Sequence, residues 1–451
     1  MLLEKSLIVI MNYNIQRATC GPKHHLFGFH DLIAFNQTGE KLLAIEADSI
    51  NRPPLAGEHF GVGYALWEEQ RFIKLGETTA LNYPQGARQQ WLSNHIFIVN
   101  NKVDEQWGSD IYDVDLGKKV SSISYPAHCV TYDGKLAFGI NYARLFRLGG
   151  YGYNGLEDKT KNETMPDNDG IFVTDIGRNQ TKLLVSIADV AKVEPSTSPQ
   201  NGFHHYVTHL CLSPDNRRIA FLHRFFLPDG GIRTRLMTIG IDGKDCRCLA
   251  SGFLSHFDWK DNHSIFIWGK ESGNIDNLRS NPILSNRFIQ PLLGIAKKVI
   301  RSFPSKTIVG SKHFLMVQDV SPQQVFPFAI GVIDEDGHPM CCPVDRNIMI
   351  CDTYPNQETK ERTLFFYHFK ENTRHDIGYF FMGDQKVDTS LEDEYLKDVD
   401  TRIRSMVSSE QLSFTRSGLH CDLHPRWDAN GKMIAFDSIH EGTRQIYIVK
   451  K

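Results

Sequence analysis

Apolar and polar residues follow a recurring order along the chain, which is clearest in the stretch Leu419–Lys450. There His424 precedes a polar turn at Asp428–Gly431, and an apolar run follows at Met433–Phe436. A second polar loop leads to another apolar run at Gln445–Val449. Short β-type runs separated by turn residues are typical of antiparallel hairpins, so the stretch predicts three strands. Three strands bury too little surface to be stable alone, and neighbouring sheets are therefore required.

The same order recurs upstream, with a histidine or an arginine before each hairpin. The segments FHDLIAFNQTGEKLLAIEA, AHCVTYDGKLAFGI and THLCLSPDNRRIAFLHRF show it clearly. About seven such units occur at a mean spacing of roughly 60 residues, which suits four-stranded blades. The repeat predicts an all-β fold, a seven-bladed β-propeller that residues 1–451 form as a single domain. The approximate blade starts are His30, Arg88, His128, His209, His256, His338 and His424.

Three segments lie outside the repeat. The last unit has only three predicted strands, so we expect an N-terminal strand at residues 5–12 to complete it and close the ring. Residues 147–170 are rich in Gly, Asn and Asp and predict a long loop of the kind that carries function. Residues 284–300 have apolar positions at near-helical spacing and predict a short helix.

Composition narrows the class of protein. Of the 451 residues, 41% are apolar and 23% are charged, which is ordinary for a globular protein with a sizeable core. The formal net charge of −3 gives no broad basic field, so we expect no nucleic-acid partner. The apolar run Ser6–Met11 is too short for a membrane span and lacks the features of a secretory signal. We therefore expect a cytoplasmic monomer without a membrane partner, or a chain whose signal is missing, and a periplasmic location stays open.

The odd number of cysteines, nine, has no regular framework and fits a reducing compartment better than a disulfide scaffold. In GHPMCCPVDRNIMICD, a central turn would place Cys341 opposite Cys351 across a hairpin. The next unit brings a further cysteine and a histidine to the same side. The sequence thus predicts a structural zinc site with ligands among His338, Cys341, Cys351, Cys421 and His424. The alternatives are buried apolar cysteines or a cross-strand disulfide.

If each unit begins with the strand nearest the propeller axis, the blade-start residues lie at similar depths around one central opening. One histidine before a hairpin is usually structural, but recurrence in six units favours a shared function. An opening lined by imidazole and guanidinium groups suits a carboxylate or polyanionic ligand. The residues predicted to bind this substrate are His30, Arg88, Arg144, His205 and His256.

Candidate acid–base residues gather in two neighbouring units, those that begin at His128 and His209. Adjacent blades would present six side chains to one groove: His128, Tyr142, Arg144, Tyr206, His209 and Arg224. The alternative is a solvated rim of aromatic residues and arginines. The set suits β-elimination on a uronic acid, because an arginine or a metal can neutralise the carboxylate and so acidify the neighbouring proton. A histidine or tyrosine then removes this proton, and another group protonates the departing oxygen.

Several segments resemble the TolB-like propellers that include oligogalacturonate lyases and ulvan lyases. They are HLFGFHD, LSPDNRRIAFLHR, LSHFDW, DTYP and CDLHPRWDANGKMIAFDSIHEGTRQIYIV. The resemblance touches most of the chain, and the histidine-bearing segments are the discriminating ones. It implies a seven-bladed propeller and a polysaccharide lyase that acts on a uronate-containing glycan or oligosaccharide.

Oligogalacturonate lyases hold a catalytic divalent metal with a Gln-x-x-His-Pro-His motif, which this chain resembles at residues 421–426, and they also resemble it at His256. Here the motif reads CDLHPR, so a cysteine replaces the glutamine and an arginine replaces the second histidine. A catalytic metal such as manganese is therefore less expected than structural zinc. Ulvan lyases resemble the chain more closely in the residue types of their sites. They use His, Tyr and Arg without a catalytic metal, and they hold a structural zinc.

By this similarity, His128 and Tyr206 are the general acid and base, and Arg224 neutralises the carboxylate. His209 and Tyr142 have supporting roles. A different kind of function stays open, a non-catalytic propeller that binds an acidic glycan or a protein partner through the same opening. Large polysaccharides are seldom met in the cytoplasm, which favours binding unless the substrates are short imported oligosaccharides.

Overall fold

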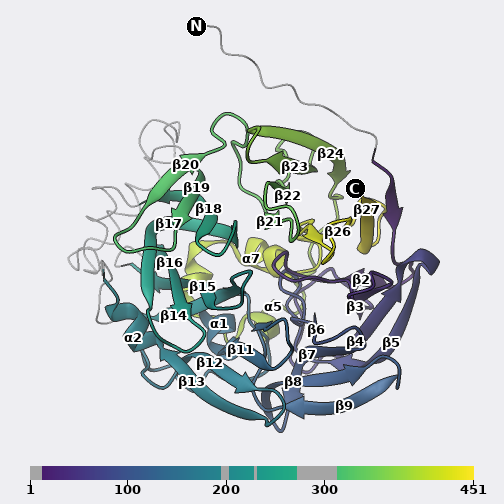
Figure 1. The fold of residues 1–451 in the computed structure, drawn as a ribbon. Coiled ribbons are helices and arrows are strands. Elements are labelled where there is room, and N and C mark those ends of the chain that lie inside the picture. Colours follow the sequence, from purple (N-terminus) through teal and green to yellow (C-terminus); the bar gives the residue numbers. More distant parts are fainter. Residues whose placement is uncertain (1–12, 195–202, 228–230, 272–311) are drawn as a thin grey trace, which may run out of the picture. The chain divides into compact units, whose positions relative to one another are not determined.

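The structure, a computed structural model, describes residues 13–194, 203–227, 231–271 and 312–451. Most of its regular structure is antiparallel β-sheet, with short helices between some of the strands. Figure 1 shows the order of these elements by colour. The described part of the chain is therefore mostly β, which agrees with the predicted class. Within the same part, no helix has both the length and the apolar character needed to span a membrane.

The chain divides into two compact units. Unit 1 comprises Met1–Lys159, Phe172–Lys182 and Gly337–Lys451. Unit 2 comprises Thr160–Ile171 and Leu183–Asp336. The single propeller domain with seven blades and a closed ring stays a prediction.

Four-stranded sheets recur in sequence order, as the repeat predicted. One contains β2 (His24–Leu26), β3 (Lys41–Ala47), β4 (Phe60–Leu66) and β5 (Arg71–Thr78). The next contains β6 (Gln90–Trp91), β7 (Ile96–Val103), β8 (Gln106–Asp113) and β9 (Lys118–Ile123). A third contains β10 (Cys129–Val130), β11 (Leu136–Ile140), β12 (Gly170–Asp175) and β13 (Gln180–Ser186). Another contains β21 (Met340–Cys341), β22 (Ile348–Asp352), β23 (Glu361–His368) and β24 (Thr373–Phe381). The strands β6, β10 and β21 begin one or two residues after the predicted blade starts.

The last sheet contains both ends of the described chain. It has the order β1-β27-β26-β25, with β1 (Ile15–Arg17), β25 (Arg426–Trp427), β26 (Met433–Ser438) and β27 (Gln445–Lys450). Strand β1 pairs antiparallel with β27, with Ile15 opposite Val449. The predicted strand at residues 5–12 lies outside the described residues. An N-terminal segment does complete this sheet as expected, and the strand that does so is Ile15–Arg17.

Unit 2 contains a seven-stranded sheet. Its strands in order are β14 (His205–Leu212), β15 (Arg218–Phe226), β16 (Ile232–Gly240), β17 (Arg247–Trp259), β18 (Ser264–Glu271), β19 (His313–Gln318) and β20 (Val325–Phe328). The first half of β17 pairs with β16, and its second half pairs with β18 from Gly252 onward, across a bulge between Leu254 and Phe257. One long strand thus joins the two repeats that the sequence predicted as separate units at His209 and His256.

The helices occupy the connections. They are α1 (Tyr142–Leu148), α2 (Ile187–Lys192), α5 (Glu392–Leu396), α6 (Thr401–Met406) and α7 (Ser409–Arg416). Helix α1 takes up the start of the predicted loop at residues 147–170, and the rest of that loop reaches the first residue of β12. The predicted helix at residues 284–300 lies outside the described residues. Helix α7 begins after Ser408, whose Oγ accepts the backbone N–H of Gln411 at 3.1 Å.

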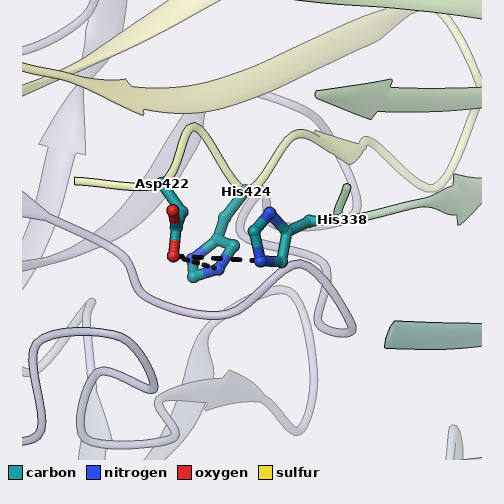
Figure 2. A group of neighbouring side chains, drawn as sticks. All are labelled: His338, Asp422 and His424. Carbon is teal, nitrogen blue, oxygen red and sulfur yellow. Dashed lines mark ion pairs between the residues drawn. The ribbon is translucent and has the colours of Figure 1, made fainter. Parts of the chain in front are cut away.

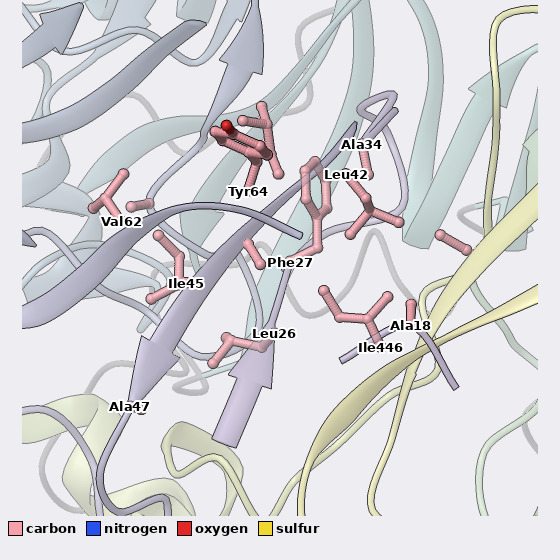
Figure 3. Close-up of a cluster of buried hydrophobic side chains, with 14 of the residues drawn as sticks. Ala18, Leu26, Phe27, Ala34, Leu42, Ile45, Ala47, Val62, Tyr64 and Ile446 are labelled. Atoms are coloured by element: carbon pink, nitrogen blue, oxygen red, sulfur yellow. The ribbon is translucent and has the colours of Figure 1, made fainter. Parts of the chain in front are cut away.

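Burial falls from the inner strands to the outer ones. The sequence of β3, KLLAIEA, is nearly continuous in apolar residues because both of its faces are covered. The first four residues of β9, an edge strand with the sequence KKVSSI, are exposed, and its lysines discourage pairing with another chain. In Figure 3, Leu42, Ile45 and Val62 from β3 and β4 share a core with Ala18 and Ile446. Each fully buried aliphatic side chain of this size stabilises the fold by roughly 1.5–3 kcal/mol.

The polar turns of the repeat have the chemistry that the sequence predicted. In the turn between β25 and β26, Oδ1 of Asp428 accepts the backbone N–H groups of Lys432 and Met433, both at 2.7 Å. Gly431 has φ of 64°, a left-handed conformation that favours glycine. The predicted hairpin around the turn Asp428–Gly431 is therefore confirmed, and the predicted third strand at Gln445–Val449 pairs with β26.

Candidate functional site

A histidine–aspartate group lies in unit 1 where two distant stretches of chain meet. His338 precedes β21, whereas Asp422 and His424 lie between α7 and β25. Candidate ligand atoms of the three side chains all lie within 4.8 Å of one another, and all three residues are buried. Figure 2 shows the carboxylate and the two imidazole rings converging. Oδ2 of Asp422 lies 3.8 Å from Nε2 of His338 and 3.7 Å from Nε2 of His424.

Asp352, the last residue of β22, orients the two histidines of this group through its carboxylate oxygens. Its Oδ1 accepts the backbone N–H of His338 at 2.7 Å and lies 2.8 Å from Nδ1 of the same residue. Its Oδ2 accepts the backbone N–H of His424 at 3.1 Å. One buried carboxylate therefore positions both histidines. A carboxylate behind a histidine in this way is the usual support of a metal-binding imidazole.

The second histidine is fixed by the backbone. Nδ1 of His424 lies 3.0 Å from the carbonyl oxygen of Gly28, so the proton sits on Nδ1 and the Nε2 lone pair faces Asp422. Within the described residues, this buried Nε2 has no hydrogen-bond partner. Burial, followed by the nearby His338, holds the pKa of His424 well below its usual value, which keeps the ring neutral. A neutral imidazole with a free lone pair is ready to bind a metal.

Asp422 carries the negative charge of the group. Nη2 of Arg362 lies 2.7 Å from its Oδ1, and Nε2 of His420 lies 3.5 Å from the same atom. Burial alone would raise the pKa of this carboxyl, but the neighbouring His420, Arg362 and His338 hold it well below its usual value. Asp422 is therefore ionised and offers Oδ2 to the two histidines. The donor set of one carboxylate oxygen and two imidazole nitrogens fits a divalent cation.

The predicted zinc set is corrected by the register of the hairpin that carries it. Cys341 pairs with Met349, and Cys351 pairs with Phe365 on the next strand, so the prediction that Cys341 faces Cys351 is wrong. The Sγ atom of Cys341 lies 3.7 Å from the carbonyl oxygens of Arg346 and Ile348. Of the five predicted ligands, only the two histidines belong to the group that can hold a metal.

The remaining thiol, Cys421, packs into the core of unit 1. Its burial raises the pKa of the thiol to about 12, so it stays protonated at neutral pH. All nine cysteines of the chain are free thiols, so the alternative of a cross-strand disulfide is excluded in this structure. The cysteine that takes the place of a metal-binding glutamine thus behaves as an apolar residue.

Arg426, which takes the place of the second histidine of the lyase motif, is also bound elsewhere. Its Nη1 lies 3.1 Å from Oδ1 of Asp437, and its Nη2 donates to the carbonyl oxygen of Gly28 at 2.9 Å. His30 supplies a third ring instead, with its centroid 5.7 Å from that of His338 and 6.0 Å from that of His424. The structure therefore places the predicted substrate residue His30 beside the group of His338, Asp422 and His424, which we call the metal-type group.

Three of the predicted blade-start residues share an uncommon backbone conformation. Arg88, His209 and His424 have φ of 53°, 56° and 43°, in the left-handed region that residues other than glycine rarely adopt. The common conformation supports the alignment of the repeats. It also turns each of these side chains away from the regular alternation of a strand.

The predicted pair His128 and Tyr142 is in direct contact in unit 1. Nδ1 of His128 lies 2.8 Å from the hydroxyl of Tyr142, and both side chains are fully buried. Tyr142 in turn stacks on Tyr153, with ring centroids 4.3 Å apart. Burial and then the charge of Arg88 hold the pKa of His128 well below its usual value. Burial also raises the pKa of Tyr142 well above its usual value.

The predicted substrate residues Arg88 and Arg144 are buried beside carboxylates. Arg88 makes two hydrogen bonds of 2.8 Å to Asp31 and donates to the carbonyl oxygen of His128. Nη1 of Arg144 lies 3.7 Å from Oδ2 of Asp158. Because all three guanidinium nitrogens of Arg88 have partners inside the protein, the structure favours a structural role for it over the predicted contact with substrate.

In unit 2, the predicted residues Tyr206 and Arg224 are neighbours. They lie directly opposite each other in the antiparallel pair of β14 and β15, and so on the same face of the sheet. Arg224 is partly exposed. Among the described residues, no hydrogen bond or ion pair engages its guanidinium, and the buried Nε has no partner. The register therefore brings these two predicted residues together, and the groove that they were predicted to share with His128, Tyr142, Arg144 and His209 stays a prediction.

The other predicted residues of unit 2 have partners of their own. Nδ1 of His205 lies 3.0 Å from Nε2 of His223, and Nδ1 of His209 lies 2.9 Å from the hydroxyl of Thr208. Nδ1 of His256 lies 3.0 Å from Oδ1 of Asp336. His205 and His209 are buried, and His256 is partly exposed.

Sequence reasoning missed both aspartates of the metal-type group. Asp422 stands two residues before His424, so a carboxylate close to the predicted histidine ligand was visible in the sequence. Asp352 lies fourteen residues beyond His338 in sequence, at the far end of a hairpin. Only the strand register brings it behind the histidine, so no local pattern predicts it.

Comparison with known proteins finds similarity in structure and none in sequence. No protein-family model and no curated protein sequence matches the chain. The crystal structure of an oligogalacturonate lyase from Vibrio parahaemolyticus is similar, with a TM-score of 0.55 and 13% identity over 99% of this chain and 98% of that chain. An oligogalacturonate lyase in complex with manganese has a TM-score of 0.53 and 12% identity over the same shares. TolB from Acinetobacter baumannii has a TM-score of 0.35 and 11% identity over 75% of this chain and 63% of that chain. At these identities the likeness to the two lyases is one of fold.

Proposed function

We propose that the protein is a lyase that cleaves a uronic-acid-containing glycan or oligosaccharide by β-elimination, assisted by a divalent cation. The cation would be held by His338, Asp422 and His424. The observation that carries the proposal is the orientation of this group, in which both Nε2 atoms face an ionised carboxylate oxygen. The fold shared with two oligogalacturonate lyases, one of them in complex with manganese, supports the same reaction class.

When bound, the cation would neutralise a substrate carboxylate and so acidify the proton on the adjacent carbon. A base then removes this proton, the bond from the neighbouring carbon to the glycosidic oxygen breaks, and a carbon–carbon double bond forms. The departing oxygen takes up a proton from an acid. The donor set of two imidazoles and one carboxylate suits manganese or a similar divalent ion, in contrast to the thiol-rich structural zinc that the sequence predicted.

For the acid–base steps we keep the residues that the sequence predicted. His128 is a candidate acid or base, with Tyr142 as its hydrogen-bonded support at 2.8 Å. Tyr206 is the second candidate, with His209 in a supporting role. Arg224 is the candidate for carboxylate neutralisation, because its guanidinium is engaged by no other described side chain. A free, partly exposed guanidinium can form two parallel hydrogen bonds with a carboxylate.

The experiment is an assay for unsaturated products with a panel of uronate polymers and oligomers. We expect ultraviolet absorbance from the new double bond in the presence of Mn²⁺, and loss of this signal after chelation. Arg224→Ala should abolish the signal while the fold stays intact, and Arg224→Lys should restore only part of it because lysine lacks the paired donors. The matched control is Arg217→Ala in the same hairpin, whose side chain is 85% exposed.

The alternative function is that of a propeller that binds an acidic glycan or a protein partner without reaction. It would be supported by binding of uronate oligomers without any unsaturated product across the panel. Full activity of Arg224→Ala would remove Arg224 from the mechanism, and activity unaffected by chelation would remove the cation.

A further inference from the structure

Arg416, the last residue of α7, is a buried cation without an anion. The residue is 5% exposed. None of its three guanidinium nitrogens has a hydrogen-bond partner in the part of the chain that the structure describes. Burial lowers the pKa of the guanidinium to about 10, so it is still charged at neutral pH. A buried charge without a partner is strongly unfavourable, and a protein that keeps one usually has a use for it.

Other buried arginines of unit 1 are paired. Arg88 meets Asp31, Arg362 meets Asp422, and Arg444 meets Asp437, each through a nitrogen–oxygen distance between 2.7 and 3.0 Å. Arg416 differs from all of these in lacking a carboxylate. The fold therefore supplies counter-ions to buried guanidinium groups elsewhere in the unit, and the exception at Arg416 is specific.

The surroundings of Arg416 leave its guanidinium in contact with a ring and with glycine backbone. The guanidinium carbon lies 5.2 Å from the centroid of the Phe146 ring on α1. Gly150, with φ of 83°, follows this helix, and a Cβ atom there would lie 3.0 Å from Nη2 of Arg416. Glycine tolerates this positive φ and has no side chain, so the backbone of Gly150 can lie beside the guanidinium. The side chain of Asn82 anchors the same turn by donating to the Gly150 carbonyl oxygen at 2.9 Å.

The end of α7 is also connected to the metal-type group. The backbone carbonyl oxygen of Thr415 lies 3.4 Å from Nδ1 of His420, whose Nε2 lies 3.5 Å from Asp422. Arg416 directly follows Thr415 in the chain. One imidazole therefore joins the end of the helix that carries Arg416 to the carboxylate that would bind the cation.

We propose that Arg416 is an anchoring residue for a carboxylate of the ligand, the carboxylate of a uronate unit. The class of ligand rests on the proposed function, whereas the need for an anion rests on the unpaired guanidinium. A planar carboxylate matches the two parallel donors of arginine, and in a water-poor environment such a charge-assisted pair is strong. Entry of the ligand requires the turn at Gly149 and Gly150 to move, since the guanidinium atoms are covered.

The test measures binding and stability of the full chain in the presence of a chelator, so that neither the cation nor turnover contributes. D-Galacturonate and D-glucuronate are the charged probes, and D-galactose is the matched neutral probe. We expect either uronate, and not galactose, to bind and to raise the thermal unfolding midpoint. Arg416→Met should weaken uronate binding at least about tenfold because the charge-assisted pair is lost.

Stability separates an anchoring role from a structural one. Arg416→Met should leave the unfolding midpoint unchanged or raise it, because an apolar side chain replaces an unpaired buried charge. The matched control Arg444→Met removes a buried arginine that has a carboxylate partner, and it should lower the midpoint by roughly 5 °C or more. Should Arg416→Met fail to fold, Arg416→Lys keeps the charge without the paired donors and should still weaken uronate binding about tenfold.

The proposal is overturned if uronates bind no better than galactose, or if Arg416→Met binds them as well as the unmodified protein does. It is also overturned if Arg416→Met is destabilised as strongly as Arg444→Met. These outcomes are independent of the lyase assay. Uronate binding through Arg416 without any unsaturated product would contradict the proposed reaction and leave the anchoring role standing.

Discussion

Two sets of metal-type side chains come from the same stretches of chain, and only one of them converges. His338, Asp422 and His424 point toward a common centre, whereas Cys341, Cys351 and Cys421 do not join them. Asp422 and Cys421 are adjacent in sequence, yet the carboxylate faces the histidines and the thiol packs into the core. In an extended chain successive side chains point to opposite sides. A shift of one position along the chain therefore decides whether a side chain is a metal ligand or part of the core.

The difference shows that the residues around a candidate metal ligand matter as much as the chemical type of that ligand. Each histidine of the converging set is held by a second residue, Asp352 behind His338 and the Gly28 carbonyl behind His424. The Sγ atoms of Cys341 and Cys351 lie near backbone carbonyl oxygens, and Cys421 packs among apolar side chains. A metal site requires such supporting contacts, because they fix the orientation and the protonation state of the ligands.

The largest effect is expected for Asp422→Asn. The substitution removes the only negative charge among the three proposed ligands, so the affinity for Mn²⁺ should fall by more than about 100-fold, beyond what loss of a supporting residue causes. Isothermal titration measures the affinity. Because the substitution leaves Arg362 without its carboxylate partner, circular dichroism is needed to verify that the variant still folds. The adjacent substitution Cys421→Ala is the control, and an equal loss of affinity there would favour the thiols.

A smaller effect is expected for Asp352→Asn. The change keeps the shape of the side chain but weakens its hold on His338 and on the backbone of His424. Loss of such a supporting carboxylate typically lowers metal affinity by about 10- to 100-fold. The same titration applies, with Asp376→Asn as a control because Asp376, also buried in unit 1, pairs with Arg374. Unchanged affinity in Asp352→Asn would mean that the histidines need no orientation.

The pH dependence of metal binding sharpens the comparison further. His424 has a pKa well below 6.5 and Asp422 one well below 3.8, so neither must lose a proton to bind a cation above about pH 6.5. These two ligands should therefore add no pH dependence to the Mn²⁺ affinity between about pH 6.5 and 8. A site that used Cys421, with its pKa of about 12, would gain about tenfold in affinity per pH unit over this range, because binding would release the thiol proton. A titration series across the range decides between the two.

Stability at acidic pH should depend on the buried histidines outside the metal-type group. Burial holds the pKa of His128 well below 6.5, so the unfolded state binds the proton more readily than the folded state does below that pH. Stability is thus full above about pH 6.5 and falls as the pH decreases, by about 1.4 kcal/mol per pH unit for one such residue. Denaturant unfolding between about pH 5 and 7 measures this slope. The slope should become shallower in His128→Gln, and an unchanged slope would exclude His128 as its source.

The smallest effect on metal binding is expected for Cys421→Ser. Affinity should change by less than about twofold, whereas stability should fall by about 1–3 kcal/mol because a hydroxyl replaces a thiol in an apolar site. Titration and denaturant unfolding of the same sample measure both quantities. A large loss of affinity with little loss of stability would reverse the comparison.

The sequence predicted the hairpins and their turns well, because these depend on local alternation and on residues such as Gly431 and Asp428. It also predicted His338 and His424 in one metal set and His128, Tyr142, Tyr206 and Arg224 in one groove. The structure brings together His338 with His424, His128 with Tyr142, and Tyr206 with Arg224, while the common groove and the roles of these residues stay predictions. These contacts follow from equivalent positions in neighbouring repeats or across one hairpin.

The rest depended on features that no local pattern specifies. The partner of Cys341 depends on the length of one turn, and the turn pairs it with Met349. The unpaired state of Arg416 depends on how α1 and α7 pack, which the repeat does not describe. Helix α7 itself had a readable signal in Ser408 and Gln411, the first and last residues of a capping box, although it lies outside the repeat.

The central claim is that an imidazole–carboxylate group, and not a thiol cluster, binds the divalent cation. Anomalous diffraction from crystals soaked in Mn²⁺ tests it most directly. The account predicts one strong peak roughly 2.0–2.3 Å from Nε2 of His338, Nε2 of His424 and Oδ2 of Asp422. A peak beside Cys341, Cys351 or Cys421, or no peak at the three proposed ligands, would contradict it.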